Sequence, residues 1–143
     1  MGLFHHHAGI ESEYITHFHI AHGDREAGLA WDLRDGDTRE IAVFRSAQGF
    51  VEEGVDPMTD GRQTLVYQGA DRHVRLVDQH LENGIAYYYT VFARGDDGDW
   101  HLQLTDTVAP EGSSHWKRAG YEGESESQQR AFDLDFDSWT LGR

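Results

Sequence analysis

The stretch LENGIAYYYTVFA, residues 81–93, contains the longest β-strand pattern in the chain. Successive side chains of a strand point to opposite faces, so an alternating pattern separates a buried face from an outward face. We expect one face of this strand to pack in a core and the other to point away from it. The expected core residues are Tyr87, Tyr89, Val91 and Ala93, and the expected outward residues are Tyr88, Thr90, Phe92 and Arg94.

The residues just before this strand predict how the chain enters it. Leu81, Gly84 and Tyr87 recur at every third position. We expect the leucine to cap the core, the glycine to turn the chain, and the tyrosine ring to pack inward. The tyrosine hydroxyl should then bond a backbone group upstream, because a polar atom buried without a partner costs free energy.

Six further runs have β-strand patterns, and no stretch keeps a helical period for more than about two turns. Phe18 and Ile20 share the expected core face of the first run, and Trp100, Leu102 and Leu104 alternate in the last. Turn-forming residues separate most of the runs. The chain is therefore predicted to be all-β, with a seven-stranded antiparallel β-sandwich between Tyr14 and Val108. The six runs are ITHFHIAH, GLAWDL, REIAVFRS, TLVYQG, HVRLVD and WHLQLTDTV.

These runs resemble the strands of fibronectin type III domains. The resemblance lies in GLAWD, IAVFRSAQGF, LVYQG and VRLVDQHLENGIAYYYTVFA, in that order. It implies an immunoglobulin-like sandwich in which Trp31 faces the core and Leu81, Gly84 and Tyr87 form the tyrosine corner of the family. The pattern is most similar to modules of phage tail and virion proteins, and it is also similar to modules of secreted bacterial polysaccharide-degrading enzymes.

The chain divides into an N-terminal arm (1–13), the fibronectin type III-like sandwich (14–110) and an extended C-terminal tail (111–143). The tail ends in the alternating segment AFDLDFDSW, and a solvated tail has no use for so many large apolar groups. It either returns to an edge of its own sandwich or adds a strand to a neighbouring subunit, with disorder as a third alternative. The predicted partner-binding residues are Trp116, Tyr121, Phe132, Leu134, Phe136 and Trp139.

The composition argues against several classes of function. The formal net charge is −14 at pH 7, whereas a nucleic-acid-binding surface needs a basic footprint. The absence of cysteine excludes disulfides and thiolate metal sites. No apolar run reaches the roughly 18 residues that a membrane span needs, so no membrane insertion is expected. The N-terminus lacks the basic and apolar segments of an ordinary signal peptide.

The tripeptide Arg94-Gly95-Asp96 follows the longest strand pattern, where a cell-attachment loop lies in the resembling family. In a chain rich in these residues the tripeptide also arises by chance. Its surroundings, RGDDGD, match a turn whose glycines supply positive φ angles. The sequence favours a plain hairpin turn over an adhesion site.

His17 and His19 share a face of the first strand and are the candidate metal ligands, since two imidazoles two positions apart can chelate Zn²⁺ or Ni²⁺. The alternative is that they stand on the solvent or partner face. His5, His6 and His7 are either part of the arm or the remnant of a tag. Asp133, Asp135 and Asp137 do not form a calcium loop, because the sixth position is Ser138 and the chain ends before the twelfth. No cofactor is predicted.

No spacing predicts a catalytic constellation, so the chain is expected not to be an enzyme. We expect a structural or interaction module, a subunit of a phage or virus particle (tail or capsid surface). Its arms would contact other protein subunits, including further copies of itself. The expected location is the virion, or otherwise the cytoplasm or the cell surface. The alternative is a carbohydrate- or surface-binding accessory module that uses Tyr88, Phe92 and Trp100 as a platform for a surface glycan.

Overall fold

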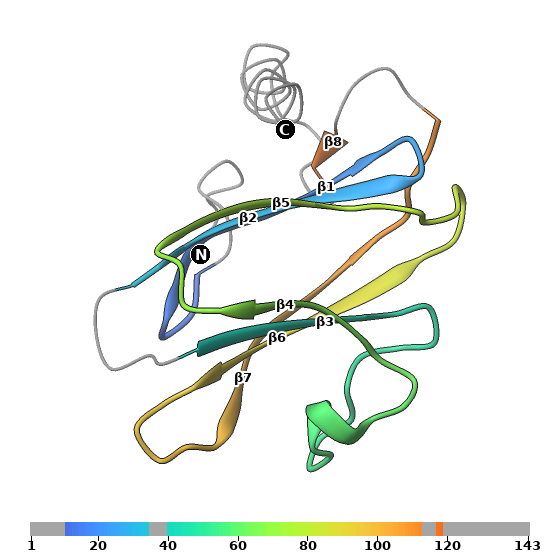
Figure 1. The fold of residues 1–143 in the computed structure, drawn as a ribbon. Helices are drawn as coiled ribbons and strands as arrows, with labels where there is room; N and C mark the ends of the chain where they lie inside the picture. Colours follow the sequence, from blue (N-terminus) through green and yellow to red (C-terminus); the bar gives the residue numbers. More distant parts are fainter. Residues whose placement is uncertain (1–10, 35–39, 113–116, 119–143) are drawn as a thin grey trace, which may run out of the picture.

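The computed structural model describes residues 11–34, 40–112 and 117–118. All strands in these ranges belong to two antiparallel sheets (Figure 1). A short 3-10 helix, Pro57–Thr59, lies between the third and fourth strands. The strands are β1 (Ile15–Gly23), β2 (Glu26–Leu33), β3 (Glu40–Ser46), β4 (Thr64–Gly69), β5 (His73–Asp78), β6 (Tyr87–Arg94), β7 (Trp100–Val108) and β8 (Lys117–Arg118).

One sheet has the strand order β5-β2-β1-β8 and the other has the order β4-β3-β6-β7. The seven strands β1–β7 coincide with the seven strand patterns of the sequence, so the prediction of an all-β chain with seven antiparallel strands is confirmed. The two-residue strand β8 is additional, and it lies within the region that the sequence analysis assigned to the C-terminal tail. Within the described ranges, no helix is long and apolar enough to cross a membrane.

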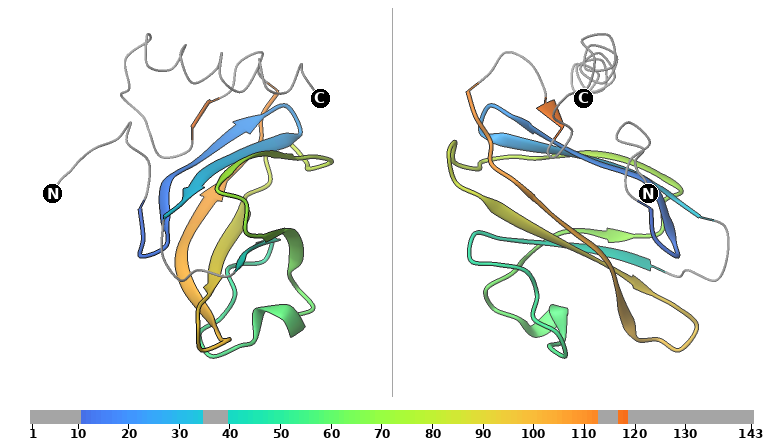
Figure 2. Two further views of the ribbon diagram at one scale, coloured as in Figure 1. Left: turned by 60° about the vertical axis from the view of Figure 1, so that its left-hand side comes forward. Right: turned by 180° about the vertical axis from the view of Figure 1, so that it is seen from behind.

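The two sheets lie face to face and share one apolar core (Figure 2). Trp31 of β2 is fully buried at its centre, where it stacks on Phe18 and meets the edge of Tyr67, with ring centroids 6.1 and 5.2 Å away. The alternation of β6 holds as predicted. The core includes Ile15, Phe18, Ile20, Leu29 and Trp31 from the first sheet, and Ile41, Val43, Tyr87, Tyr89, Val91, Ala93 and Leu104 from the second.

A β-bulge in β1 interrupts the alternation of buried and outward residues along the strand. Thr16 pairs with Asp32 and His19 pairs with Ala30, so β1 has one residue more than β2 in this interval. His17 takes up the extra length with a φ of 56°, a conformation uncommon for a residue other than glycine. As a result Ile15 and Phe18 are both fully buried although they lie three positions apart.

A second bulge corrects the expectation for β7. Val91 pairs with Leu104 and Phe92 pairs with Leu102, which leaves Gln103 as the extra residue. Leu104 therefore faces the core, whereas Trp100 and Leu102 lie on the outer face, and Leu102 is 57% exposed. The common face predicted for Trp100, Leu102 and Leu104 was wrong, because a single inserted residue moves all residues beyond it to the other face.

The tyrosine corner predicted from the spacing of Leu81, Gly84 and Tyr87 is present. The backbone N–H of Glu82 donates to the Tyr87 hydroxyl at 2.9 Å. Gly84 has a φ of 85°, which favours glycine, and its N–H donates to the carbonyl of Pro110 at 2.8 Å. Leu81 is 2% exposed and caps the core. This corner fixes the entry into β6 and ties it to the segment after β7.

Replacing Tyr87 with Phe should lower the free energy of unfolding by about 1 kcal/mol, because the part-buried hydrogen bond from the Glu82 N–H is lost. Urea denaturation measures the change. Tyr88→Phe is the matched control, since Tyr88 is half-buried on the other face of the same strand, and it should change stability by less than about 0.5 kcal/mol. Equal effects for the two variants would contradict a role for the corner hydrogen bond.

A polar network crosses the core between the sheets. Asp78 of β5 accepts from Arg45 Nη1 of β3 at 2.6 Å and from the Tyr89 hydroxyl of β6 at 2.8 Å. The Asp78 and Arg45 side chains are 10% and 21% exposed. Burial, followed by the Asp78 charge, raises the pKa of Tyr89 far above its ordinary value, so this hydroxyl keeps its proton and remains a donor. Both carboxylate oxygens of Asp78 are thus occupied by the opposite sheet.

Asp78→Ala should lower the free energy of unfolding by about 3–5 kcal/mol, because it leaves the Arg45 charge and the Tyr89 hydroxyl without their acceptor. Chemical denaturation of this variant and of the exposed control Glu53→Ala measures the difference. The control is expected to stay within about 0.5 kcal/mol of the parent chain. A loss for Asp78→Ala no greater than that of the control would show that the network does not hold the sheets together.

The outer face of the β4-β3-β6-β7 sheet is partly covered by the segment 47–63. The N–H of Val51 donates to the Thr90 hydroxyl at 3.2 Å, and the Phe50 ring meets the Tyr88 ring with centroids 5.1 Å apart. Beneath them Phe44 and Phe92 form an edge-to-face pair at 6.0 Å. Thr90 and Phe92 point away from the core as predicted, yet they are only 0% and 7% exposed.

Candidate functional site

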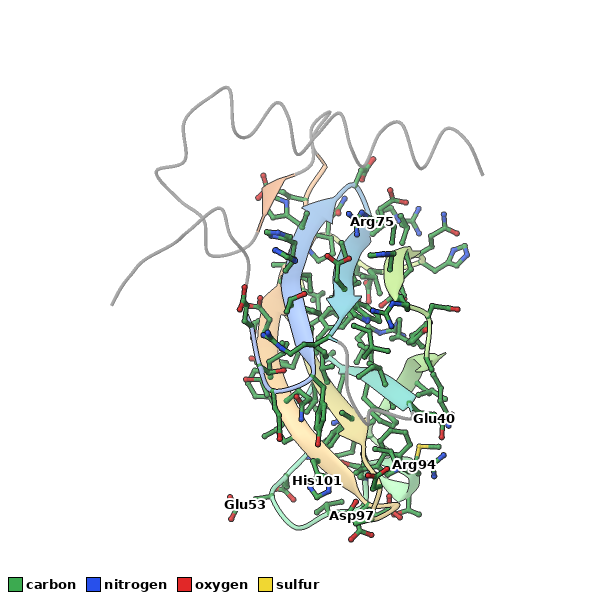
Figure 3. All side chains as sticks on the ribbon, turned by 90° about the vertical axis from the view of Figure 1, so that its left-hand side faces the viewer. Glu40, Glu53, Arg75, Arg94, Asp97 and His101 are labelled. Atoms are coloured by element: carbon green, nitrogen blue, oxygen red, sulfur yellow. The ribbon has the colours of Figure 1, made fainter. Side chains whose placement is uncertain are left out.

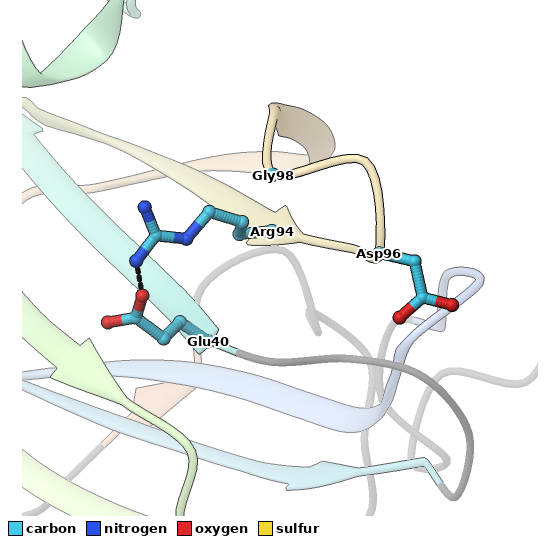
Figure 4. Close-up of a pocket in the computed structure, with 4 residues that line it drawn as sticks. All are labelled: Glu40, Arg94, Asp96 and Gly98. Atoms are coloured by element: carbon cyan, nitrogen blue, oxygen red, sulfur yellow. Dashed lines mark ion pairs between the residues drawn. The ribbon is translucent and has the colours of Figure 1, made fainter.

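An open hollow of about 500 Å³ lies at the end of the molecule where β3 begins and β6 ends (Figure 4). It is lined by Glu40, Arg94, Asp96 and Gly98. The lining carries carboxylates, one guanidinium and a turn glycine. These four residues offer hydrogen-bonding and charged groups, and none of them carries a hydroxyl, thiol or amine nucleophile.

Arg94 is held in this hollow by its neighbours on the sheet. Its guanidinium pairs with Glu40 and lies 4.8 Å from the centroid of the Trp100 ring. The other oxygen of Glu40 accepts from Gln68 Nε2 at 2.9 Å. Four adjacent strands thus contribute one side chain each to a continuous row. Exposed pairs of this kind add at most about 1 kcal/mol of stability, so the row mainly fixes the direction of the arginine.

Arg94-Gly95-Asp96 opens a hairpin turn, as the sequence predicted. The N–H of Gly98 donates to the Gly95 carbonyl at 3.1 Å, and Gly98 has a φ of 79°. Because Arg94 is the last residue of β6 and is bound to Glu40, its guanidinium is not presented on the turn beside Asp96.

Asp97 stabilises the same turn. Its carboxylate accepts from the Asp99 N–H at 3.0 Å and from His101 Nε2 at 2.7 Å. The backbone hydrogen bond, followed by that of His101, lowers the pKa of Asp97. Asp97 and His101 lie beside Arg94 at one end of the molecule, with Arg75 at the opposite end (Figure 3). The carboxylate is thus used in holding the turn.

Two histidines share one carboxylate on the outer face of the other sheet. Asp32 of β2 lies 3.0 Å from His17 Nδ1 and 2.9 Å from His73 Nδ1, through its two different oxygens. Burial raises the pKa of Asp32, but the hydrogen bonds from His73 and His17 outweigh it and the pKa is lowered. An ionised carboxylate only accepts, so each Nδ1 carries a proton. This cluster holds the β1 bulge against β2 and β5.

His17 therefore has Asp32 as its partner, with His73 on the other oxygen, and this hydrogen-bonded pairing differs from a chelate with His19. In the described ranges, no group of three or more histidine, cysteine, aspartate or glutamate side chains could hold a metal ion. His5, His6 and His7 lie outside those ranges. The metal-ligand hypothesis for His17 and His19 stays a prediction.

Asp106 is a half-buried carboxylate on the inner face of β7. It pairs across the strands with Tyr89 and lies between Leu104 and Val108, which are both buried. Burial raises the pKa of Asp106 from 3.8 to about 6, and the hydrogen bond from the Thr107 N–H only partly opposes this. An inward-facing charge on an edge strand disfavours pairing with another sheet edge.

Asp106→Asn should stabilise the protein at pH 7.5 and leave its stability unchanged near pH 3.5. The pKa of about 6 in the folded chain exceeds the ordinary 3.8, so both states are protonated at low pH. As the pH rises from about 4 to 6, the unfolded state ionises first and stability falls by up to about 3 kcal/mol. Urea denaturation at both pH values tests this, with the exposed Asp99→Asn as control. A gain in stability that is independent of pH would contradict the raised pKa of Asp106.

The aromatic platform expected for a glycan-binding module is incomplete. Phe92 is 7% exposed and packs under Val51 and Phe44, so it cannot contact a sugar ring. Tyr88 is half-buried against Phe50, and the Trp100 ring faces the Arg94 guanidinium. The expectation that Phe92 is available for binding was wrong, because the sequence does not reveal that segment 47–63 covers this face.

The tail residues predicted to bind a partner, Trp116, Tyr121, Phe132, Leu134, Phe136 and Trp139, lie outside the described residues. The described part of the tail beyond residue 112 is β8. It pairs antiparallel with β1, with Arg118 opposite Ala21 and Lys117 opposite His22. The beginning of the tail thus adds a strand to an edge of its own domain.

No protein-family model matches the chain, and no curated protein matches it. Several solved structures are similar, two of which are described here. The crystal structure of pectate lyase Pel3 from Pectobacterium carotovorum is 16% identical with a TM-score of 0.44, and the match covers 68% of this chain but only 27% of the lyase. The solution structure of a fibronectin type III domain derived from the human KIAA0970 protein is 14% identical with a TM-score of 0.49, covering 76% of this chain and 83% of that domain. Because both TM-scores are low, the fold assignment depends on the sheet order and register of this chain.

Sequence reasoning missed the inward-facing carboxylates, although a signal for them exists. Asp78 follows Val74 and Leu76 at alternate positions of β5, and Asp106 lies between Leu104 and Val108 in β7. A carboxylate at an inward position of a strand indicates a buried partner or a shifted pKa. Asp32 and His73 could not have been paired in the same way, because β2 and β5 are neighbours only in the folded sheet.

Proposed function

We propose that the chain is a fibronectin type III-like module with a structural and interaction role and no catalytic activity. The strand order β5-β2-β1 against β4-β3-β6-β7, with the Tyr87 corner at the start of β6, supports this fold family. The residues that line the polar hollow, Glu40, Arg94, Asp96 and Gly98, include no hydroxyl, thiol or amine nucleophile, and this supports a non-catalytic role. A module of this kind acts through its surfaces and its arms.

The observation that carries the proposal is the pairing of β8 with β1. It supports a mode of contact in which the tail supplies backbone hydrogen bonds to a sheet edge, and alternate side chains then select the register. The same mode serves contacts between subunits. Other protein subunits, including further copies of this chain, are therefore the proposed partners, reached through the N-terminal arm and the tail.

The proposed setting is a phage or virus particle, at its tail or capsid surface. It is supported by the similarity of the strand motifs to modules of virion proteins. Cytoplasmic and cell-surface locations are the alternatives. The acidic composition, with 26 Asp and Glu against 12 Lys and Arg, disfavours nucleic acid as a partner.

Purified particles from the source test the proposal. The chain should be present in them at fixed stoichiometry by mass spectrometry, and recombinant chain should rebind to particles stripped of it. A variant that lacks residues 119–143 should rebind at least about tenfold more weakly, while its thermal midpoint shows that the sandwich remains folded. Absence of the chain from the particles would contradict the setting, and equal binding of both forms would contradict the role of the tail.

The carbohydrate- or surface-binding alternative has a narrower basis. Trp100 and the polar groups of the hollow remain available, but Phe92 does not. A glycan array with the full chain, repeated with Trp100→Ala, tests this alternative. Binding that is lost in the variant would favour it over the structural role.

A further inference from the structure

The edge of β1 is only partly covered by the described residues. β1 has nine residues, and β2 pairs along one side of it from Ile15 to Gly23. On the other side, β8 pairs with Ala21 and His22. For residues 15–20 the described chain supplies no strand on that side. An uncovered edge is a template for pairing with another strand, and natural proteins generally cover or interrupt such edges.

The two faces next to this edge differ in chemistry. On the outer face of the sheet, basic side chains gather around a single carboxylate, Asp32: they are His17, His19, His73 and Arg75. On the inner side, the edge of β1 lies beside β7, where Gln103 accepts from the Ser12 hydroxyl and the Tyr14 N–H at 2.7 and 3.2 Å. The inner face of β7 carries Leu104 next to Asp106. A strand added here turns one face towards the apolar core side of the sheet and the other towards these basic side chains, which an apolar face and an acidic face complement.

One segment of the chain has this pattern. In residues 131–139, AFDLDFDSW, the apolar side chains of Phe132, Leu134 and Phe136 alternate strictly with three aspartates. As a strand, this segment presents the apolar residues to one face and the carboxylates to the other. The carboxylates would lie beside the basic outer face and the aromatic rings above β7. The reverse orientation would bury three charges, which fixes the face that each side chain takes.

The chain between β8 and this segment is long enough for a return to the same domain. Residues 119–130 can span up to about 40 Å when extended, whereas residues 15–20 of β1 extend over about 20 Å. β8 already brings the tail to this edge. A short linker gives an effective concentration in the millimolar range, which favours the same chain over a second copy at ordinary protein concentrations.

We propose that in the isolated chain the segment 131–139 adds a strand to its own domain along residues 15–20 of β1, with Phe132, Leu134 and Phe136 facing β7. The edge is then covered until assembly. A neighbouring subunit could be engaged by exchange of this strand, as in domain swapping. The proposal concerns the unassembled chain, so it can fail while the particle-binding role stands, and the reverse also holds.

Hydrogen exchange of the full-length chain, measured by mass spectrometry, tests the proposal. The triple variant Phe132→Ser, Leu134→Ser, Phe136→Ser should accelerate exchange of the amides in residues 15–20 by about tenfold or more, because an uncovered edge loses its backbone partners. Amides of β3 should not change. The matched control replaces Glu122, Glu124 and Glu126 with Ser, which alters the linker and not the donor strand. Light scattering of the same samples should give the mass of a monomer.

The possible outcomes separate the alternatives. Unchanged exchange in residues 15–20 of the triple variant would overturn the proposal. A dimer whose protection disappears on dilution would also overturn it and would assign the segment to a second copy. Faster exchange in β3 as well would mean that the triple variant loosens the whole domain. In that case a chain that ends at residue 130 replaces the triple variant in the test. A peptide of residues 131–143, added at about 1 mM, should restore protection of residues 15–20 in that chain, and failure to do so would overturn the proposal.

Discussion

The Asp78 carboxylate is the interaction on which the relative position of the two sheets depends. Apolar packing holds sheets together but is not directional, so it permits small sliding and rotation. Asp78 reaches from β5 to Arg45 on β3 and Tyr89 on β6, and each bond requires a particular distance. A buried charge is tolerated only when both oxygens are paired. These two bonds restrain how β5 lies over β3 and β6.

The two outer faces of the sandwich differ in what covers them. The face of the β4-β3-β6-β7 sheet is partly covered by segment 47–63, through Val51 and Phe50, and this removes Phe92 from solvent. The face of the β5-β2-β1-β8 sheet carries the Asp32 cluster, and its β1 edge receives β8. Of the two sheets, the β5-β2-β1-β8 sheet is thus the one that the described beginning of the tail joins.

The bulges at His17 and Gln103 connect these features. Each inserts one residue and so exchanges inner and outer side chains beyond it. His17 reaches Asp32 from the bulge, and Gln103 reaches Ser12 and Tyr14 from the other. The bulges thus lie on the two neighbouring edge strands, β1 and β7, and shape the side of the sandwich that the tail is proposed to approach. The inward carboxylate of Asp106 disfavours the pairing of a further strand with the edge of β7.

Sequence reasoning alone predicted the class of fold, the seven strands, the buried face of β6 and the Tyr87 corner. These features depend on local alternation and on short spacings, which a single chain displays directly. Tertiary structure alone decided the parity changes in β1 and β7, the coverage of Phe92, and the pairing of Asp32 with His73 and of Asp78 with Arg45. Each of these joins residues that are distant in the chain, and a bulge or a covering segment leaves no periodic trace in the sequence. The fold was therefore readable from the sequence, whereas the surfaces available for contact were set by how the strands meet.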